Sequence, residues 1–404
     1  MHKNTDLQRP LEGVRVVDLT SIIFGPMATQ MLADMGAEVI KVEAPGGDGV
    51  RHVEPMRSPG MGAVFLNSNR AKKSLVLDLK TELGRKALRR LVATADVFVH
   101  SIRGQAAARL SIDYDSLKRI KSDLVYCFAS GYDSRGPNAD LPAYDDIIQA
   151  ATGLASITTC ADGTPQLVRT IVADKVGALY LCNAILGAIM TLKGTGNGQY
   201  VEVPMFECMT HFMMVEHMSA ASFEPPMGPA GYRRVLAANR QTYQTKDSHI
   251  AMLPYTTSQW QRFLQLIGEN ELAQSDWVLD PAKRSARIEE LYGLIAEVTP
   301  TRTTAEWVSE LRGIDVPVTA VNTLNDLFTD PQLQASGLFE EYEHPTEGRL
   351  RGASTPVQSG HADPETAPIA PHLGEHTRAI LAELDYDETE IDALIAAGAA
   401  METI

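Results

Sequence analysis

The chain has few cysteines, and no two of them have the short spacing that binds metal or carries redox chemistry. Its 404 residues include four cysteines and no CxxC motif. All four lie in largely apolar stretches, so we expect reduced core residues and neither disulfides nor a catalytic thiolate. His211 and His217 are six residues apart, which does not place two ligands on one helix face. The sequence therefore predicts no metal site. The cysteines are Cys127, Cys160, Cys182 and Cys208.

The chain also lacks an excess of positive charge. Lys and Arg number 36 against 51 Asp and Glu, which gives a formal charge of -15 at pH 7. Nucleic acids and anionic membrane surfaces attract a positive field, so the composition argues against both as partners, and an anionic ligand would need local basic groups. Residues 1–13 show no signal-peptide pattern, and there is no uninterrupted apolar run of roughly 18 residues. We expect a soluble, cytoplasmic protein.

The first half of the chain alternates short apolar runs with helical patterns. Residues 14–19 are a short apolar run rich in valine. Residues 26–36 begin with proline and end with glycine, which is typical of a helix, and a second apolar run follows at 38–43. This is the pattern of a β–α–β unit. Further candidates continue the alternation and predict a doubly wound parallel sheet covered by helices. They are strands at 75–78, 96–100 and 124–129 and helices at 81–93 and 114–120.

The second half indicates a separate, smaller body. A single core rarely grows beyond roughly 250 to 300 residues, so a chain of 404 residues is expected to form two domains. A long helix is predicted at 174–192, and the glycine-rich turn at 194–199 leads into a strand. Its glycines do not have the GxGxxG spacing of a dinucleotide site. The Pro- and Gly-rich stretch 222–231 is typical of a linker. Residues 247–320 are predicted to form a mixed α and β domain, and residues 373–403 a helical tail.

Eight segments, in this order, together resemble the class III CoA-transferases, the family of carnitine, bile-acid and formyl-CoA transferases. The resemblance covers nearly the whole chain. The segments are LEGVRVVDLT at 11–20, GPMATQMLADMGAEVIKVE at 25–43, NRAKKSLVLDLK at 69–80, ADVFVHSIRG at 95–104, YDSRGPNADLPAYDDIIQAATGL at 132–154, VADKVGAL at 172–179, RQTYQTKDSHIAM at 240–252 and LGEHT at 373–377.

The resemblance implies an α/β fold with a large doubly wound, Rossmann-like domain and a smaller α+β domain. It also implies an interlocked homodimer, in which two chains thread through each other like links. On this basis residues 1–221 are predicted as the N-terminal part of the large CoA-binding domain, 222–246 as a linker and 247–325 as the small domain. Residues 326–404 are predicted as a second linker and a C-terminal part that returns to the large domain.

Asp174 matches the position of the family's nucleophilic aspartate, at the start of a predicted helix. A carboxylate there is favoured by the helix dipole and is expected to remain ionised, as a nucleophile must. The alternative is that Asp174 only caps the helix. The resemblance implies that the carboxylate attacks an acyl-CoA donor, passes through a mixed anhydride and holds CoA as an aspartyl thioester until a free carboxylic acid accepts it.

Tyr144 helps to separate two reactions that share this family fold. In α-methylacyl-CoA racemases, which move a proton beside the thioester, the position of Tyr144 matches a histidine. A tyrosine with a pKa near ~10 is a poor base at neutral pH, so the residue favours CoA transfer. The alternative is that Tyr144 simply packs under the sheet.

CoA carries several phosphate charges, which an acidic chain must meet with local cations. By resemblance, Lys72 lies near the nucleotide and Arg109 near the diphosphate, with Arg103 as a further cation and Phe24 and Ile102 as neutral contacts. Each cation could instead be solvated surface. We therefore expect coenzyme A or an acyl-CoA as substrate, a small carboxylic acid and a second copy of the chain as partners, and neither a metal nor a redox cofactor.

Several residues depart from formyl-CoA transferase. Ile23, Ala44 and Ser101 replace a glutamine, an arginine and an asparagine, and RQTYQTKD at 240–247 stands where that enzyme has a glycine-rich loop. The formyl and oxalate pair is therefore not expected as the substrate pair. Two other functions stay open: a racemase or lyase acting on an acyl-CoA α-carbon, and a CoA-binding protein without activity. The acids do not follow from the sequence, because acyl specificity depends on pocket shape.

Overall fold

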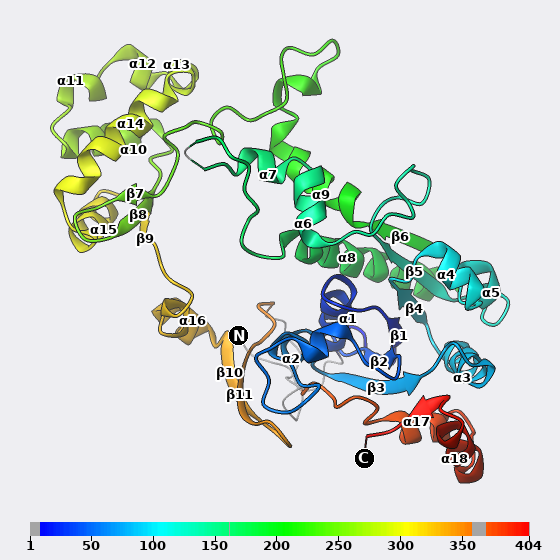
Figure 1. Ribbon diagram of the computed structural model, residues 1–404. Helices are drawn as coiled ribbons and strands as arrows, with labels where there is room; N and C mark the ends of the chain where they lie inside the picture. The colour runs from blue at the N-terminus through cyan, green and yellow to red at the C-terminus, as the bar shows by residue number, and fades with distance from the viewer. Residues whose placement is uncertain (1–8, 161, 358–368, 404) are drawn as a thin grey trace. The chain divides into compact units, whose positions relative to one another are not determined.

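The computed structural model describes residues 9–160, 162–357 and 369–403 (Figure 1). The chain divides into a large unit, Met1–Met213 with Gly337–Ile404, and a small unit, Met214–Ser336. The small unit takes in the stretch 222–246, which the sequence indicated as a linker. The reason is that Ala237 and Tyr243 of this stretch are buried in the core of the small unit.

The large unit is built on a seven-stranded sheet with the order β12-β3-β2-β1-β4-β5-β6. All neighbouring strands are parallel except β12, which runs antiparallel to β3. The order 3-2-1-4-5-6 is that of doubly wound folds, so the predicted parallel α/β core is confirmed. The strands are β1 (Arg15–Leu19), β2 (Glu38–Glu43), β3 (Lys72–Leu77), β4 (Val97–His100), β5 (Val125–Ser130), β6 (Tyr200–Pro204) and β12 (Ala400–Met401).

Helices cover both faces of this sheet because successive strand residues point to opposite sides. Val16 of β1 belongs to the core shared with α1 and α8, and the next residue, Val17, belongs to the core shared with α3, α5, α17 and α18. The helices of the unit are α1 (Phe24–Asp34), α2 (Ala63–Ser68), α3 (Glu82–Ala93), α4 (Gly104–Arg109), α5 (Tyr114–Lys118), α6 (Asp145–Ala151), α7 (Leu154–Ile157), α8 (Val172–Thr195), α17 (Thr377–Glu383) and α18 (Glu388–Ala396), with the 3-10 turn η1 (Gly49–His52) and most of α9 (Met205–His217).

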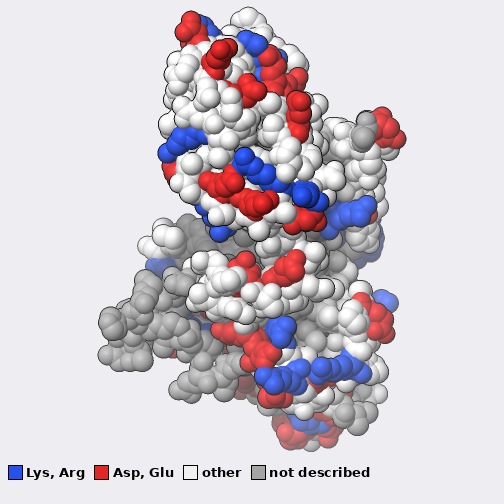
Figure 2. Space-filling model, turned by 90° about the vertical axis from the view of Figure 1, so that its left-hand side faces the viewer, with Lys and Arg blue, Asp and Glu red and all other residues white. Residues whose placement is uncertain are grey.

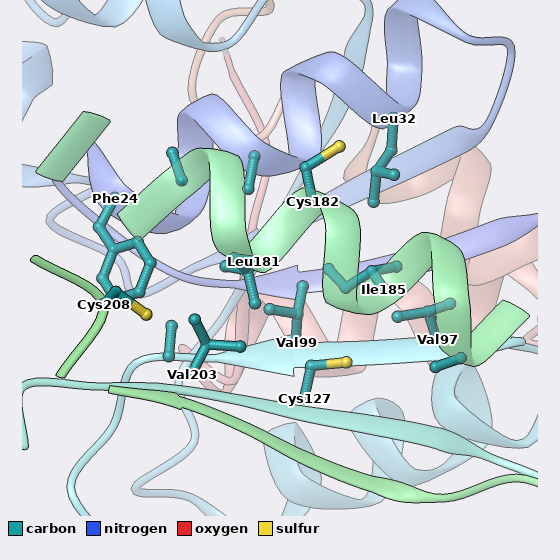
Figure 3. Close-up of a cluster of buried hydrophobic side chains, with 14 of the residues drawn as sticks. Phe24, Leu32, Val97, Val99, Cys127, Leu181, Cys182, Ile185, Val203 and Cys208 are labelled. Carbon is teal, nitrogen blue, oxygen red and sulfur yellow. The ribbon is translucent and has the colours of Figure 1, made fainter. Parts of the chain in front are cut away.

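The long helix α8 is the central helix of one face. It has 24 residues, and an 18-residue window within it has a mean hydropathy of 1.6, so it is long and apolar enough to cross a membrane by length and composition alone. In this fold, however, Leu181 and Ile185 of α8 point toward Val97 and Val99 of β4 (Figure 3). The helix ends at Gly196, which caps it in a left-handed conformation with φ 72°.

The part of the chain after the small unit returns to the large unit. It contributes a hairpin, α17, α18 and the short strand β12, in which Ala400 pairs with Leu77 of β3. Helix α18 begins with a capping box between Asp387 and Glu390. The hairpin consists of β10 (Phe339–His344) and β11 (Gly348–Ala353), paired antiparallel.

The small unit combines an antiparallel sheet, in the order β7-β8-β9, with short helices. Its core is aromatic, with Trp260, Phe263, Tyr292 and Trp307 buried. Its elements are η2 (Ser219–Ser222), β7 (Tyr243–Gln244), β8 (His249–Met252), α10 (Thr257–Leu266), α11 (Asn270–Ala273), α12 (Asp276–Leu279), α13 (Pro281–Ala286), α14 (Ile288–Val298), η3 (Thr299–Thr301), α15 (Thr304–Gly313), β9 (Val318–Ala320), η4 (Asp326–Phe328) and α16 (Pro331–Ser336).

Candidate active site

Asp174 lies where the N-termini of α1 and α8 meet. It is in the first turn of α8 and is 7% exposed. Its Oδ1 accepts a hydrogen bond of 3.1 Å from the backbone N–H of Phe24, the first residue of α1. The Phe24 ring packs against Gly177, one turn further along α8, where an added Cβ would lie 2.9 Å from the ring. A larger residue at 177 would require the Phe24 ring to shift.

A second carboxylate, Asp145, occupies the N-terminus of α8. Its Oδ1 accepts the N–H of Ala173 at 2.6 Å and that of Asp174 at 3.4 Å. Its Oδ2 accepts a 2.5 Å hydrogen bond from Nε2 of Gln149. Asp145 belongs to the first turn of α6, so it caps a helix that is distant in sequence. Asp145 therefore accepts hydrogen bonds from the N–H groups of Ala173 and Asp174, which the side chain of Asp174 is not needed to cap.

Burial and the neighbouring carboxylate change the ionisation of Asp174. Burial, and then the charge of Asp145, raise the pKa of Asp174 from 3.8 to about 6, and the Phe24 N–H offsets this only in part. Burial and the second carboxylate thus act on this group in addition to the helix dipole. Because a pKa of about 6 is below 7, Asp174 is still mostly ionised at neutral pH, and it is more basic than an ordinary aspartate.

Tyr144 is next to Asp145 in the chain and precedes α6 as the N-cap residue. Its side chain is 66% exposed, so the alternative that it packs under the sheet is wrong.

Three of the predicted CoA contacts lie on the loops that leave β1 and β4. Phe24 follows β1, and Ile102 and Arg103 follow β4. β1 and β4 are neighbours at the point where the strand order reverses, which is where doubly wound folds bind their ligands. Arg103 is exposed and donates from Nη1 to the carbonyl oxygen of Asp140 at 3.1 Å. Arg109, the last residue of α4, is also exposed. These contacts remain predictions.

Lys72 has a different environment from the one expected. Its side chain is 0% exposed, and its Nζ lies 3.1 Å from Oδ2 of Asp18. The same Nζ donates to the carbonyl oxygen of Pro26 at 2.9 Å and to Oδ1 of Asn69 at 2.8 Å. In this arrangement Lys72 is not available to a phosphate, because its three donors are used inside the fold.

The cysteines agree with the expectation of reduced core residues at three positions. Cys127, Cys182 and Cys208 are buried, whereas Cys160 is exposed, so the expectation is wrong for that residue. Burial raises the pKa of the Cys182 thiol to about 11 and that of Cys208 to about 12. These two thiols therefore carry little thiolate at neutral pH.

One group within the described part of the chain has residue types that could hold a metal ion: His344, Glu347 and His372, whose ligand atoms lie within 4.8 Å of one another. The hydroxyl of Thr346 lies among them. It is 2.6 Å from Nε2 of His372 and donates to Oε1 of Glu347 at 2.9 Å. This hydrogen-bonded group ties the hairpin to the segment that follows it.

Comparison with known proteins gives the class to which this site belongs. Residues 11–377 match CoA-transferase family III. The chain therefore belongs to this family and is an enzyme of the family III CoA-transferase class.

Named relatives cover almost the whole chain. It is 32% identical over 387 residues to a succinate–glutarate CoA-transferase of Agrobacterium fabrum, covering 94% of this chain and 96% of the relative. It is 30% identical over 396 residues to a human succinyl-CoA:glutarate CoA-transferase, covering 96% and 90%. A crystal structure of a CaiB/BaiF family protein from Brucella suis superposes with a TM-score of 0.79 at 33% identity, covering 94% of this chain and 100% of that one.

Sequence reasoning missed two parts of the site. The first is Asp145, which the pattern AYDD at 143–146 could have indicated, since an acidic pair after a loop is typical of a helix start. The second is the backbone N–H of Phe24, which no side-chain pattern could have shown, because it depends on how two helix N-termini meet.

Proposed function

We propose that the enzyme transfers CoA between dicarboxylic acids of four to five carbons, through a covalent intermediate on Asp174. The observation that carries the mechanism is a buried carboxylate with a pKa of about 6 whose Oδ1 receives a backbone N–H. The substrate class is supported by the succinate and glutarate of the relatives' names.

The reaction begins when Oδ2 of Asp174 attacks the thioester carbon of the donor acyl-CoA. The C–S bond breaks, CoA leaves as a thiolate, and a mixed anhydride joins the acyl group to Asp174. The thiolate then attacks Cγ of Asp174, the donor acid leaves as a carboxylate, and an aspartyl-CoA thioester remains. The acceptor carboxylate reverses these steps and departs as its CoA ester.

Phe24 supplies the donor that this sequence of steps requires. When the thiolate attacks Cγ, negative charge develops on Oδ1, and the N–H of Phe24 already lies 3.1 Å from that atom. A fixed donor at a developing oxyanion lowers the barrier because it needs no reorganisation during the reaction. In this proposal the N-terminus of α1 therefore stabilises the oxyanion.

In this proposal CoA binds at the carboxyl ends of the neighbouring strands β1 and β4. Phe24 and Ile102 contact its apolar portion, and Arg103 and Arg109 meet its phosphates. The overall acidity of the chain does not oppose this. On the face shown in Figure 2, basic and acidic side chains of the described residues are interspersed, so local cations determine where an anion binds.

Tyr144 supports transfer over racemisation. Tyr144 directly precedes Asp145 in the chain and is exposed, so its hydroxyl offers the acceptor acid a hydrogen-bond donor where the racemases of this fold have a histidine.

The proposal includes a homodimer. Large apolar side chains on α8 and α9 are exposed in the single chain, among them Leu179 at 51%, Met190 at 76% and Phe212 at 51%. Clusters of such residues are typical of protein interfaces, and the interlocked dimer implied by the family resemblance would cover them.

The test is to incubate the enzyme with succinyl-CoA and to look by intact mass for a CoA adduct, then to map it to one peptide. We expect the adduct on Asp174, its loss in Asp174→Ala, and its discharge by added glutarate. An adduct on another residue would overturn the site. Exchange of the α-proton of a 2-methylacyl-CoA with deuterated water, without an acceptor acid, would instead indicate a racemase.

A further inference from the structure

The loop between β1 and α1 rests on a buried network of charges. Nζ of Lys41 lies 2.9 Å from Oδ2 of Asp48, and Nζ of Lys72 lies 3.1 Å from Oδ2 of Asp18. The side chains of these four residues are at most 1% exposed. Burying charges costs stability unless they are well paired. Apolar residues of similar volume in place of a buried ion pair often give a fold of equal or higher stability. A function other than stability would explain the network.

The two lysines also bind the backbone of the loop. Nζ of Lys41 donates to the carbonyl oxygen of Thr20 at 2.9 Å, and Nζ of Lys72 donates to that of Pro26 at 2.9 Å. These carbonyls lie on either side of Phe24 in the chain. The ammonium groups therefore fix both ends of the segment that carries the Phe24 N–H.

The two aspartates bind the same loop through its N–H groups. Oδ1 of Asp48 accepts the N–H of Ile22 at 3.0 Å, and Oδ1 of Asp18 accepts that of Thr20 at 2.9 Å. Ile22 has a φ of 69°, a conformation that is strained for a β-branched residue and persists only where the surroundings impose it. The loop does not take this shape by local preference, so the charge network holds it there.

We propose that the two lysines and two aspartates of this network are positioning residues of the transferase. They hold the loop so that the Phe24 N–H meets the Asp174 oxygen that becomes negative as the aspartyl thioester forms and breaks. This inference rests on the proposed function and deepens it. It also gives Lys72 a part in the reaction that needs no contact with CoA.

The experiment removes one ion pair as a unit, in the variant Lys41→Met/Asp48→Asn, which leaves no unpaired charge. Single-turnover formation of the CoA adduct is followed by intact mass with saturating succinyl-CoA. The rate constant at saturating succinyl-CoA is expected to fall by about 10- to 100-fold, up to the effect of losing one oxyanion donor. A purely structural role would lower the amount of adduct but not the rate constant of the folded fraction.

The matched control is Lys73→Met/Glu38→Gln. It removes another lysine–carboxylate pair between β3 and β2, with Nζ and Oε1 2.5 Å apart, and neither partner has a hydrogen bond to the loop among the described residues. The pair is partly exposed, so its loss is expected to change the rate constant by less than about twofold. An equal fall in both double variants would overturn the positioning role.

A second variant covers the case in which the first does not fold. Ile22 is 38% exposed, and proline cannot adopt a φ of 69°, so Ile22→Pro moves the loop without disturbing the core. It is expected to slow adduct formation in the same way. A wild-type rate constant in either folded variant overturns the inference. A wild-type enzyme that forms no adduct at Asp174 overturns the proposed function instead, so the two failures are distinguishable.

Discussion

Replacing Asp174 by asparagine is expected to abolish CoA transfer and, at pH 7, to stabilise the folded protein. The pKa of Asp174 is about 6 in the folded chain against an ordinary 3.8, because burial and then the charge of Asp145 disfavour its ionised form. The folded state therefore binds this proton more tightly than the unfolded chain does. As a result the free energy of unfolding falls as pH rises through the window from 3.8 to about 6.

The magnitude follows from that difference in pKa. At about 1.4 kcal/mol for each tenfold change in proton affinity, the ionised carboxylate lowers the stability by about 3 kcal/mol at pH 7. Asparagine has nearly the same shape and keeps an oxygen for the Phe24 N–H, so the substitution removes the charge and little else. We expect Asp174→Asn to gain about 2 to 3 kcal/mol at pH 7, and nothing near pH 4.

Urea unfolding of wild type and variant, at one protein concentration and from about pH 4 to about pH 8, measures this gain. Asp146→Asn is the control, because Asp146 is an exposed neighbour in α6 and its replacement should stay within about 0.5 kcal/mol. Equal stabilities of wild type and Asp174→Asn across the range would refute the raised pKa of a buried Asp174 carboxylate. A stabilised variant that still transfers CoA would place the nucleophile elsewhere.

Three further outcomes can be measured. The rate of adduct formation should fall as pH drops through about 6, and Asp145→Asn should move the midpoint of this pH profile downward, because a like charge is removed. Gly177→Ala should slow the adduct step, because the added Cβ would lie against the Phe24 ring. Gly187→Ala in the same helix is the control, since its Cβ would meet nothing within 4 Å. It should leave the rate unchanged and raise the stability measured by chemical denaturation by about 0.5 to 1 kcal/mol. A thiol reagent should label Cys160 first in the native protein, as peptide mapping would show, because the other cysteines are buried.

The alternation of strands and helices could be predicted from sequence because each core strand has its own apolar run. β3 is instructive where prediction fell short. We expected it from residue 75, but it begins at Lys72. A hydrophobic pattern does not reveal a buried lysine whose charge is met by an aspartate 54 residues away in the chain. The expectation that Lys72 lies near the nucleotide came from the family resemblance, which does not show that the side chain is buried.

The sequence could predict single residues of the site but not the contacts between them. Asp174 followed from the family resemblance, but its raised pKa depends on Asp145, which contacts Ala173 across 28 positions of sequence. Such a contact depends on how α6 packs against α8, and no local pattern encodes it. In the same way, the proline and glycine density of the predicted linker does not show that Tyr243 is buried.

Two buried aspartates of the large unit show how the fold separates structural from reactive carboxylates. Burial by itself would raise the pKa of Asp18, but Lys72 and Lys41 outweigh it and lower the pKa to about 2. Asp174 has no such cation among the causes of its shift, only another aspartate, and its pKa rises to about 6. Environments that push two like groups apart in pKa are a common sign of divided roles. Asp18 therefore stays ionised beside its lysines, whereas Asp174 is more basic than an ordinary aspartate yet still mostly ionised at neutral pH. These are the two properties that the proposed nucleophilic role requires.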